Sequence, residues 1–514
     1  MTNRNQPWTP DFQRIHEVLD RWADERADAV ALQDMHTRLS YAELKAAVAA
    51  NAAQLRAHGV RPGDRLMLVA ENSVATAVLL LAGSALDAWV VVVNARLSAR
   101  EIDDFIEHSG ARRVVYMSHV SAQAAAHGVR HGAQAVELPA LGSLLLGPLA
   151  GNARAETVHA DPAEQVAAMI YTSGTSGSPK AVMLTHANLQ FAAQGARDVR
   201  RLGPGDRLYG VMPMAHVVGL STQVLGSLMS GATLLLVPRF DPMEAARTLA
   251  EEGITVFTGV PVMFAKLLDW SRANGVAFAA PQLRLATVSG APLLPGLKSE
   301  VEKVLGMPLH NGYGLTELSP TVAVTTSEAP RTDCSVGQPM PGLELRFVDE
   351  QGADVAPGEV GELWVRGPNV MKGYYRSPKL TEKAVDPQGW FNTGDLARLG
   401  PDGALHIAGR TKELIIRSGF NVYPVEVEQV LDSHSDVVQS AVVGRPVEDN
   451  EEVVAFVELA AGSTLTEAEL GKYLRERLSP YKLPAEIRFL AQFPAGSTGK
   501  VLKHVLKDMA RQPA

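Results

Sequence analysis

The sequence has few of the features that mark secreted, membrane-anchored or nucleic-acid-binding proteins. Its single cysteine, Cys334, can form no internal disulfide, which is typical of proteins in a reducing cytosol. The first residues lack the apolar segment of a secretory signal. Lysine and arginine total 48 against 56 aspartates and glutamates, and both signs are mixed along the chain. We therefore expect a cytoplasmic protein without a nucleic-acid partner.

One apolar run, Ala75 to Val93, is close to the length of a bilayer span. Gly83 and Ser84 divide it into a helix-like half and a valine-rich half, and Asp87 interrupts it. This pattern fits a buried helix that leads into a buried parallel strand. No transmembrane segment is therefore expected.

The chain of 514 residues is too long for one hydrophobic core, and its pattern changes along the sequence. From about residue 30 to 340, apolar runs alternate with amphipathic segments, which predicts doubly wound α/β sheets with ligand sites at the carboxyl ends of strands. Short strands and Gly-rich turns from about 335 to 406 predict a small β-barrel-like module. We predict a large domain over 1–410 and a small α+β domain over 411–514.

Several elements can be placed within these regions. The strands expected in the first region lie at residues 65–69, 89–93, 113–116, 232–237 and 285–288. In the last region we expect helices at about 424–433 and 467–478, and strands at 437–443 and 453–459. The search for functional residues should therefore concentrate on the loops between these elements.

The most informative segment is the loop from Tyr171 to Lys180, Tyr-Thr-Ser-Gly-Thr-Ser-Gly-Ser-Pro-Lys. Its glycines let backbone N–H groups approach oxyanions, its hydroxyl groups donate hydrogen bonds, and its lysine adds a mobile positive charge. It is not a Walker A loop, because the lysine leads into an apolar strand rather than opening a helix. A flexible turn is the alternative, but the fixed pattern favours phosphate binding. The candidate phosphate-binding residues are Thr172, Ser173, Gly174, Thr175, Ser176, Gly177 and Lys180.

This loop resembles the signature loop of the adenylate-forming superfamily, which includes acyl-CoA synthetases, the adenylation domains of peptide synthetases and beetle luciferases. Further motifs follow in the family order: Met214–His216, Val288–Pro292, Asn311–Glu317, Gly389–Asp395, Gly409–Ile416 and Pro494–Lys500. Together they cover nearly the whole chain, which is identified as a member of this superfamily, similar to AMP-dependent acid:CoA ligases. The resemblance implies that a carboxylic acid reacts with ATP to give acyl-AMP and pyrophosphate, and that the acyl group then passes to coenzyme A.

The resemblance also implies roles for the nucleotide-site residues. Attack of a carboxylate on the α-phosphate gathers about four or more negative charges, so Mg²⁺ and positive groups are required. Glu317 would be the metal carboxylate, and Thr316 would bind the α-phosphate. Asp395 would accept the ribose hydroxyls, and Arg410 would reach the ribose or phosphate side of the nucleotide. The residues expected around adenine are Gly290, Ala291, Pro292, Asn311, Gly312 and Tyr313.

Near the carboxyl terminus the resemblance implies a mobile domain. Lys500 would bridge the acid and the nucleotide during adenylation, and Lys412 falls at the hinge position. Rotation about this hinge would withdraw Lys500 and bring in the loop of Gly419, which opens a path for the pantetheine thiol. The alternative for Lys500 is a solvated helix face shared with Lys503 and Lys507 at spacings of three and four.

The acyl pocket is expected to be apolar and uncharged. His216 faces this pocket in relatives, although a satisfied core histidine is the alternative. Ala215 takes a place usually held by an aromatic residue, which should widen the pocket, and these segments offer no basic partner for a second carboxylate. The expected lining is His216, Val218, Val260, Gly314 and Leu318. A medium- or long-chain fatty acid is therefore expected, and an aryl acid stays open.

Other functions stay open beside this one. Asn450 and Glu451 stand where relatives generally carry an aromatic residue and a glycine, and an added negative charge near CoA phosphates would be unfavourable. A carrier-protein phosphopantetheine is therefore an alternative acceptor, and a luciferase-like oxygenase is a second alternative. A catalytically silent relative is disfavoured, because the phosphate, metal and ribose residues named above are all retained. Besides the carboxylic acid, the expected ligands of the protein are ATP, Mg²⁺ and CoA. The protein could also form a homodimer.

Overall fold

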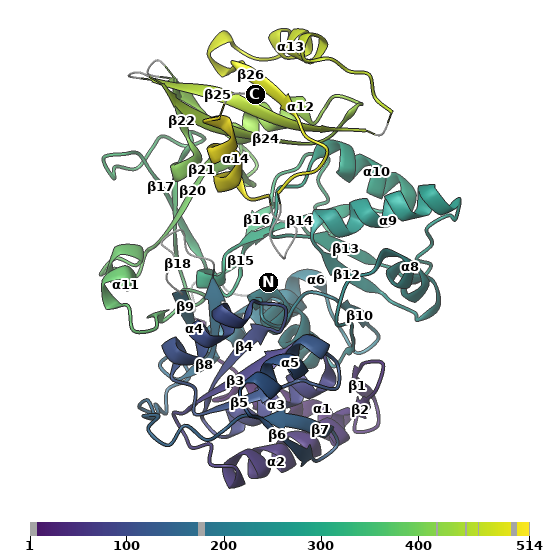
Figure 1. The fold of residues 1–514 in the computed structure, drawn as a ribbon, viewed down its shortest axis with the longest axis vertical. Coiled ribbons are helices and arrows are strands. Elements are labelled where there is room, and N and C mark those ends of the chain that lie inside the picture. Colours follow the sequence, from purple (N-terminus) through teal and green to yellow (C-terminus); the bar gives the residue numbers. More distant parts are fainter. Residues whose placement is uncertain are drawn as a thin grey trace.

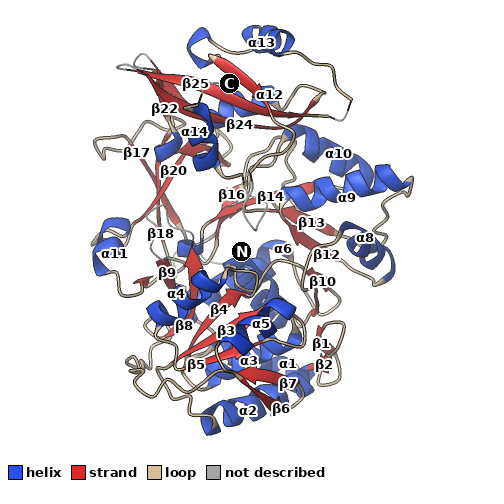
Figure 2. Cartoon of the chain, in the orientation of Figure 1, coloured by secondary structure: helices blue, strands red, loops and turns tan. Residues whose placement is uncertain are grey.

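The computed structural model describes residues 8–172, 180–417, 420–447, 450–460, 462–494 and 501–512. Two large α/β sheets make up the lower and middle parts of the molecule, and the residues after 411 lie above them (Figure 1). Helices pack around the strands in the lower part (Figure 2). The predicted α/β fold class is therefore confirmed.

The first large sheet has a parallel centre and antiparallel edges. β3 pairs in parallel with β4 and β5, and all of β3 is buried, as expected for a strand covered on both faces. The order across this eight-stranded sheet is β19 (Gly373–Tyr374), β9 (Lys180–Thr185), β8 (Val166–Thr172), β4 (Trp89–Asn94), β3 (Arg65–Ala70), β5 (Arg113–Tyr116), β7 (Gly142–Leu146) and β6 (Gln134–Leu138). The helices in this part of the chain are η1 (Ile15–Leu19), α1 (Asp20–Glu25), α2 (Tyr41–Ala57), α3 (Val74–Ala85), α4 (Ala99–Ser109) and α5 (Ala122–Arg130).

The second large sheet has a run of parallel strands from β11 to β14 at its centre. The order across this nine-stranded sheet is β16 (Gln338–Pro339), β15 (Thr321–Val324), β14 (Leu309–Gly314), β13 (Leu285–Val288), β12 (Val256–Gly259), β10 (Arg207–Gly210), β11 (Thr233–Leu236), β1 (Val30–Gln33) and β2 (Arg38–Ser40). The helices here are α6 (His186–Arg200), the π-helix η2 (Val218–Leu225), α7 (Gly226–Met229), α8 (Pro242–Glu251), α9 (Pro261–Asn274), α10 (Pro295–Leu305) and η3 (Thr316–Leu318). The strands predicted from the apolar runs are confirmed.

The apolar run that matched a bilayer span in length is α3 followed by β4. Ser73 caps α3 by accepting a hydrogen bond from the Thr76 N–H, and the helix is buried almost completely. The turn between the two elements contains Asp87 with φ +54°, a left-handed conformation that aspartate tolerates better than most residues. Its Oδ1 lies 2.6 Å from Arg14 Nε. In the described ranges no helix has the length and hydropathy to cross a membrane.

The β module differs from the prediction. Its strands form an open four-stranded antiparallel sheet in the order β17 (Glu344–Val348), β18 (Gly361–Arg366), β20 (Phe391–Leu399) and β21 (Leu405–Arg410). The barrel-like closure that we expected is wrong for the described residues, because β17 and β21 remain the two edges of this sheet. Two short strands of the same region join the large sheets instead: β16 pairs with β15, and β19 pairs with β9. The helix α11 (Pro378–Ala384) follows β19.

The residues from 411 onward form a smaller α/β unit at the top of Figure 1, which we call the upper unit. Its elements are η4 (Thr411–Glu413), β22 (Ile415–Arg417), β23 (Phe420–Val422), α12 (Pro424–Leu431), β24 (Val437–Val447), β25 (Asn450–Leu459), α13 (Glu467–Arg475), η5 (Pro480–Lys482), β26 (Glu486–Phe489) and α14 (Lys503–Ala510). β24 and β25 are longer than predicted, because their pairing continues as far as Val447 opposite Asn450. The domain boundary at residue 410 stays a prediction.

Candidate active site

The predicted motif loops meet at the carboxyl ends of parallel strands in the nine-stranded sheet. The registers of β12, β13 and β14 align their ends, and the loop after β10 reaches the same edge because β10 pairs with β12 in parallel. Ligand sites of doubly wound sheets form at this edge. The predicted residues brought to this edge are His216, Val260, Gly290, Ala291, Pro292, Asn311, Gly312, Tyr313 and Gly314.

Tyr313, Asp395 and Arg410 form a connected group that we call the Asp395 cluster. Asp395 is only 2% exposed, its Oδ2 accepts a hydrogen bond from the Tyr313 hydroxyl, and its Oδ1 lies 2.9 Å from Arg410 Nε. The register of β20 and β21 places Asp395 directly opposite Arg410. Burial works against the charge on Arg410, but the nearby Asp395 raises its pKa. The cluster thus holds the Asp395 carboxyl group in a buried position between a hydroxyl donor and a guanidinium.

Glu317 and Lys180 both contact the side chain of Tyr374. The Tyr374 hydroxyl donates a hydrogen bond to Glu317 Oε1 at 2.9 Å, and Lys180 Nζ lies 5.9 Å from the centroid of the same ring. Burial and the Glu317 charge raise the pKa of Tyr374, so the phenol stays protonated and donates. The expected metal carboxylate and the expected phosphate lysine therefore face one aromatic side chain.

Glu317 is carried by η3, the short 3₁₀ helix directly after β14. The turn into this helix requires Gly314, since a Cβ there would lie 2.0 Å from the carbonyl oxygen of Pro320. Thr316 and Glu317 are half-buried. Leu318, which we expected to line the acyl pocket, is fully buried and packs in the hydrophobic core.

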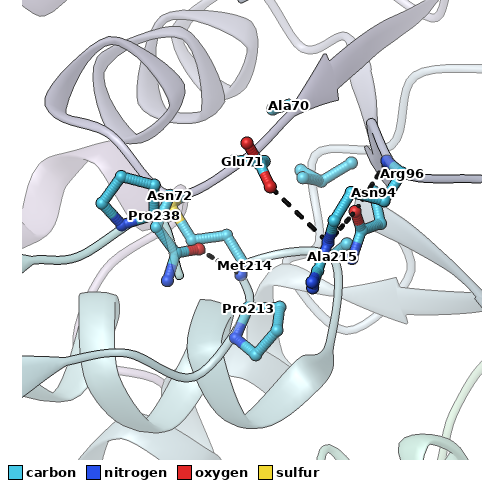
Figure 3. A pocket seen from close by; sticks show the side chains of 10 residues that line it. Ala70, Glu71, Asn72, Asn94, Arg96, Pro213, Met214, Ala215 and Pro238 are labelled. Carbon is cyan, nitrogen blue, oxygen red and sulfur yellow. Dashed lines mark hydrogen bonds and ion pairs between the residues drawn. The ribbon is translucent and has the colours of Figure 1, made fainter. Parts of the chain in front are cut away.

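The loop that carries His216 is held by two buried amide side chains. Asn72 donates from Nδ2 to the Met212 carbonyl oxygen at 2.9 Å and accepts from the Met214 N–H at 2.8 Å. Figure 3 shows Asn72 beside Met214 in the wall of a small cavity. Gln223 of η2 accepts a hydrogen bond from the Met212 N–H at 3.1 Å. This bracing fixes the backbone just before His216.

Part of the His216 side chain is exposed to solvent. The protein atoms around the imidazole nevertheless remove enough water from it to lower its pKa. No charged side chain among the described residues contributes to that shift. Ala215 and Val218 beside it are half-buried. The cavity next to this loop is lined by Ala70, Glu71, Asn72, Val92, Asn94, Arg96, Pro213, Met214, Ala215 and Pro238 (Figure 3).

The residues expected around adenine are held in place mainly by backbone hydrogen bonds and backbone conformation. Asn311 turns its Nδ2 to the Cys334 carbonyl oxygen at 3.0 Å, and its N–H donates to Thr325 Oγ1 at 2.8 Å. Asn311 therefore braces the end of β14. Gly290 is in the left-handed region at φ +84°, and a Cβ added there would lie 3.7 Å from Val260 Cγ1. Direct contact of either residue with adenine stays a prediction.

Lys412 lies in η4, where the upper unit begins directly after β21 of the four-stranded sheet. Burial lowers the pKa of Lys412, and the charges of Arg410 and Lys180 act in the same direction. Lys507 of α14 donates from Nζ to the Lys412 carbonyl oxygen at 3.3 Å. The expected hinge position therefore lies near two other predicted site residues, while its role as a hinge stays a prediction.

Lys503 is held between two carboxylates. Its Nζ lies 3.1 Å from Glu413 Oε2 and 2.7 Å from Glu428 Oε1. Burial opposes its charge, but the two carboxylates raise the pKa of Lys503. The solvated helix face that we considered for the carboxyl-terminal lysines is therefore wrong for Lys503, because the side chain turns inward to form ion pairs.

Several predicted residues lie outside the described part of the chain: Ser173, Gly174, Thr175, Ser176, Gly177, Gly419 and Lys500. The described residues next to the phosphate-binding segment are Thr172 and Lys180, which lie opposite each other in the β8–β9 pair. Next to the carboxyl-terminal loop, the Leu502 N–H donates to the Pro494 carbonyl oxygen at 2.8 Å. These pairs fix the positions from which both predicted loops begin and end.

Glu451 does not point freely toward solvent. It lies on β25, and its Oε2 accepts a hydrogen bond from the Ile416 N–H at 2.7 Å. A backbone donor thus compensates part of its negative charge. The charge conflict with a CoA phosphate that we expected from the sequence is reduced by this contact.

The donor set around Glu317 fits Mg²⁺. The described residues contain no group of three or more His, Cys, Asp or Glu side chains that could form a protein cage for a metal. Mg²⁺ in nucleotide enzymes is usually held by one or two carboxylates together with substrate phosphates. A single half-buried carboxylate near a phosphate-type lysine meets that requirement.

Two residues of this region were missed by sequence reasoning. The position of Tyr374 near Glu317 could not be predicted from the sequence, because it depends on the pairing of the two-residue strand β19 with β9. Asn72 could have been found, since a polar residue shortly after a buried parallel strand lies at the ligand edge of the sheet. Both act on residues that the sequence did identify.

Comparison with known proteins gives consistent matches over the whole chain. The family model for AMP-binding enzymes matches residues 19–375, and the model for the AMP-binding enzyme C-terminal domain matches residues 426–500. Feruloyl-CoA synthase of Amycolatopsis is 34% identical over 95% of this chain and 98% of that protein. Long-chain-fatty-acid–CoA ligase of Salmonella typhimurium is 31% identical, over 98% of this chain and 96% of that protein. The ATP-bound structure of MatB from Rhodopseudomonas palustris is similar with a TM-score of 0.85 and 31% identity, covering 97% of this chain and 99% of that one.

Proposed function

We propose that the substrate of this protein is an apolar monocarboxylic acid. The chain belongs to the AMP-binding enzyme family of the adenylate-forming superfamily and is an AMP-forming acid:CoA ligase. The first candidate is a medium- or long-chain fatty acid. An aryl acid is the second, and the similarity to a feruloyl-CoA synthase favours it.

The environment of His216 carries this proposal. Its pKa is lowered by burial alone, and no cation among the described residues acts on it. Arg96, which lines the neighbouring cavity, already lies 3.5 Å from Glu71 Oε1, so a second carboxylate on the substrate would have to compete with Glu71 for this cation. The small side chain of Ala215 leaves room for an alkyl chain or a ring.

In the first half-reaction, an oxygen of the acid attacks the α-phosphorus of ATP and displaces pyrophosphate. We assign the ribose to Asp395 and Arg410, the triphosphate to the 172–180 loop with Lys180, and the α-phosphate to Thr316. Bound at Glu317, Mg²⁺ would neutralise phosphate charge. Lys500 would stabilise the same transition state, as the family resemblance implies.

In the second half-reaction, the CoA thiol attacks the acyl carbonyl carbon and AMP leaves. The mixed anhydride is already reactive, so no side-chain nucleophile is needed, and burial raises the pKa of the Cys334 thiol to about 11. CoA is preferred to a carrier-protein thiol, because Glu451 is engaged by the Ile416 N–H. Rotation at Lys412 would exchange Lys500 for the Gly419 loop between the two steps.

The test is a panel of fatty, aryl and dicarboxylic acids, scored for pyrophosphate release with and without CoA. We expect release with apolar monocarboxylates and multiple turnovers only when CoA is present. Selective activity with dicarboxylates would contradict the apolar-pocket proposal. A rate that does not respond to CoA would contradict CoA as the acceptor. The ratio of fatty to aryl turnover decides between the two candidate acids.

A further inference from the structure

Tyr374 contacts the two opposite charges that we assign to ATP binding, Glu317 and Lys180. Its hydroxyl donates to Glu317 Oε1 at 2.9 Å, and its ring lies 5.9 Å from Lys180 Nζ. These two contacts use different parts of the side chain, the polar tip and the aromatic ring. One residue therefore contacts both the expected metal carboxylate and the expected phosphate lysine.

The backbone around Tyr374 is fixed on both sides. β19 pairs with β9, with Tyr374 opposite Val182, two residues after Lys180. The Met371 N–H donates to the carbonyl oxygen of Glu317 at 2.9 Å, and the Tyr374 N–H donates to Thr381 Oγ1 at 2.9 Å. The segment is thus tied both to the strand that follows the phosphate-binding loop and to the helix η3 that carries Glu317.

We propose that Tyr374 is a positioning residue that keeps Glu317 and Lys180 apart and directed to the nucleotide phosphates. Opposite charges this near to one side chain would gain by pairing directly, and each would then be partly neutralised before ATP arrives. The hydroxyl gives Glu317 a neutral donor in place of the ammonium group, and the ring gives Lys180 a weak partner that phosphate can displace. This inference rests on the proposed function of the same site.

The variant Tyr374→Phe separates the two contacts, because it removes the hydroxyl and keeps the ring and the strand pairing. Tyr374→Leu removes both contacts. Tyr375→Phe is a matched control: its hydroxyl donates to Glu156 Oε1 at 2.6 Å, so it loses the same kind of bond to a different carboxylate. Thermal unfolding of each variant checks that the fold is retained.

The primary readout is binding of Mn²⁺ to the full-length enzyme with a non-hydrolysable ATP analogue, followed by electron paramagnetic resonance. We expect Tyr374→Phe to weaken Mn²⁺ binding about tenfold, since a hydrogen bond to a charged group is lost. The Mg²⁺ concentration for half-maximal pyrophosphate exchange should rise by a similar factor. Tyr374→Leu should weaken both further, and Tyr375→Phe should leave both unchanged.

Unchanged Mn²⁺ binding in folded Tyr374→Phe would overturn the inference, and so would an equal change in Tyr375→Phe. Mn²⁺ binding needs no acid substrate, so failure of the acid panel would count against the proposed substrate and not against this role. A further check uses supplied acyl-adenylate, which lacks the β- and γ-phosphates. Its thiolysis should be unaffected in Tyr374→Phe, and a tenfold loss there would contradict a role confined to the phosphates.

Discussion

The nucleotide side of the site and the unit after residue 411 are built in different ways. On the nucleotide side, side chains from several strands already bond to one another, as in the Asp395 cluster and in the Tyr374–Glu317 pair. Near the connecting segment, the described side-chain contacts include Lys503 to Glu413, Lys507 to the Lys412 carbonyl, and Thr411 to Glu362. Sheet register fixes the first arrangement, whereas the second depends on ionic and hydrogen-bond contacts around a short link. This difference is compatible with the proposed mechanism, in which a preorganised ATP site is served by a unit that changes position.

The largest effect is expected from Asp395→Ala. The substitution removes the proposed ribose acceptor and leaves the half-buried Tyr313 hydroxyl and Arg410 guanidinium without their carboxylate. Since AMP stays bound in both half-reactions, both should fall, each by about a hundredfold or more. Rapid-quench measurement of adenylation and of thiolysis checks this. Loss of adenylation alone would mean that the cluster does not hold the part of the nucleotide common to both steps.

The next effect concerns the stability of the upper unit. Lys503→Met leaves Glu413 and Glu428 near each other without their shared cation, which should cost about 3–5 kcal/mol. Lys507→Met is the control, because it removes only a long hydrogen bond and should cost about 1 kcal/mol or less. Hydrogen exchange resolved to α14 and β24 measures both. Similar losses in the two variants would mean that the Lys503 ion pairs contribute little.

A smaller effect should appear in the pH dependence of the same unit. Burial and the nearby Glu428 raise the pKa of Asp432 to about 8, while an aspartate in the unfolded chain has a pKa of about 3.9. Between these values the folded state holds a proton that the unfolded state has lost, so the contribution of Asp432 to stability falls as pH rises from about 4 to about 8.

Asp432→Asn should remove this dependence and stabilise the upper unit at pH 8 by about 1–3 kcal/mol. Urea unfolding of both proteins at pH 5 and pH 8 measures the difference. The comparison of the two proteins at pH 5 is the control, because the stability gained by the substitution should be smaller there. An equal stability difference at both pH values would show that Asp432 does not titrate in this range.

Much of the framework follows from local patterns in the sequence. The valine-rich run at β4 and the helix-like half at α3 were predicted correctly, because burial on both faces and the Gly83–Ser84 break leave few alternatives. The barrel-like module was wrong, because short strands and turns do not reveal whether the two edge strands will pair. Motif residues were recognised by type and order, whereas their partners were not. The Tyr374–Glu317 contact joins residues 57 positions apart and depends on the pairing of β19 with β9 and on the backbone hydrogen bond from Met371 to Glu317.

The most direct test of the comparison is Lys500→Ala, assayed separately in the two half-reactions. Lys500 is expected to act only during adenylation, whereas the Asp395 cluster is proposed to hold the nucleotide in both steps. The account predicts that acid-dependent pyrophosphate exchange falls by about a hundredfold or more. It also predicts that CoA attack on supplied acyl-adenylate stays within about twofold of the wild-type rate. An equal loss of both half-reactions would contradict a fixed nucleotide site served by a unit that moves between the two steps.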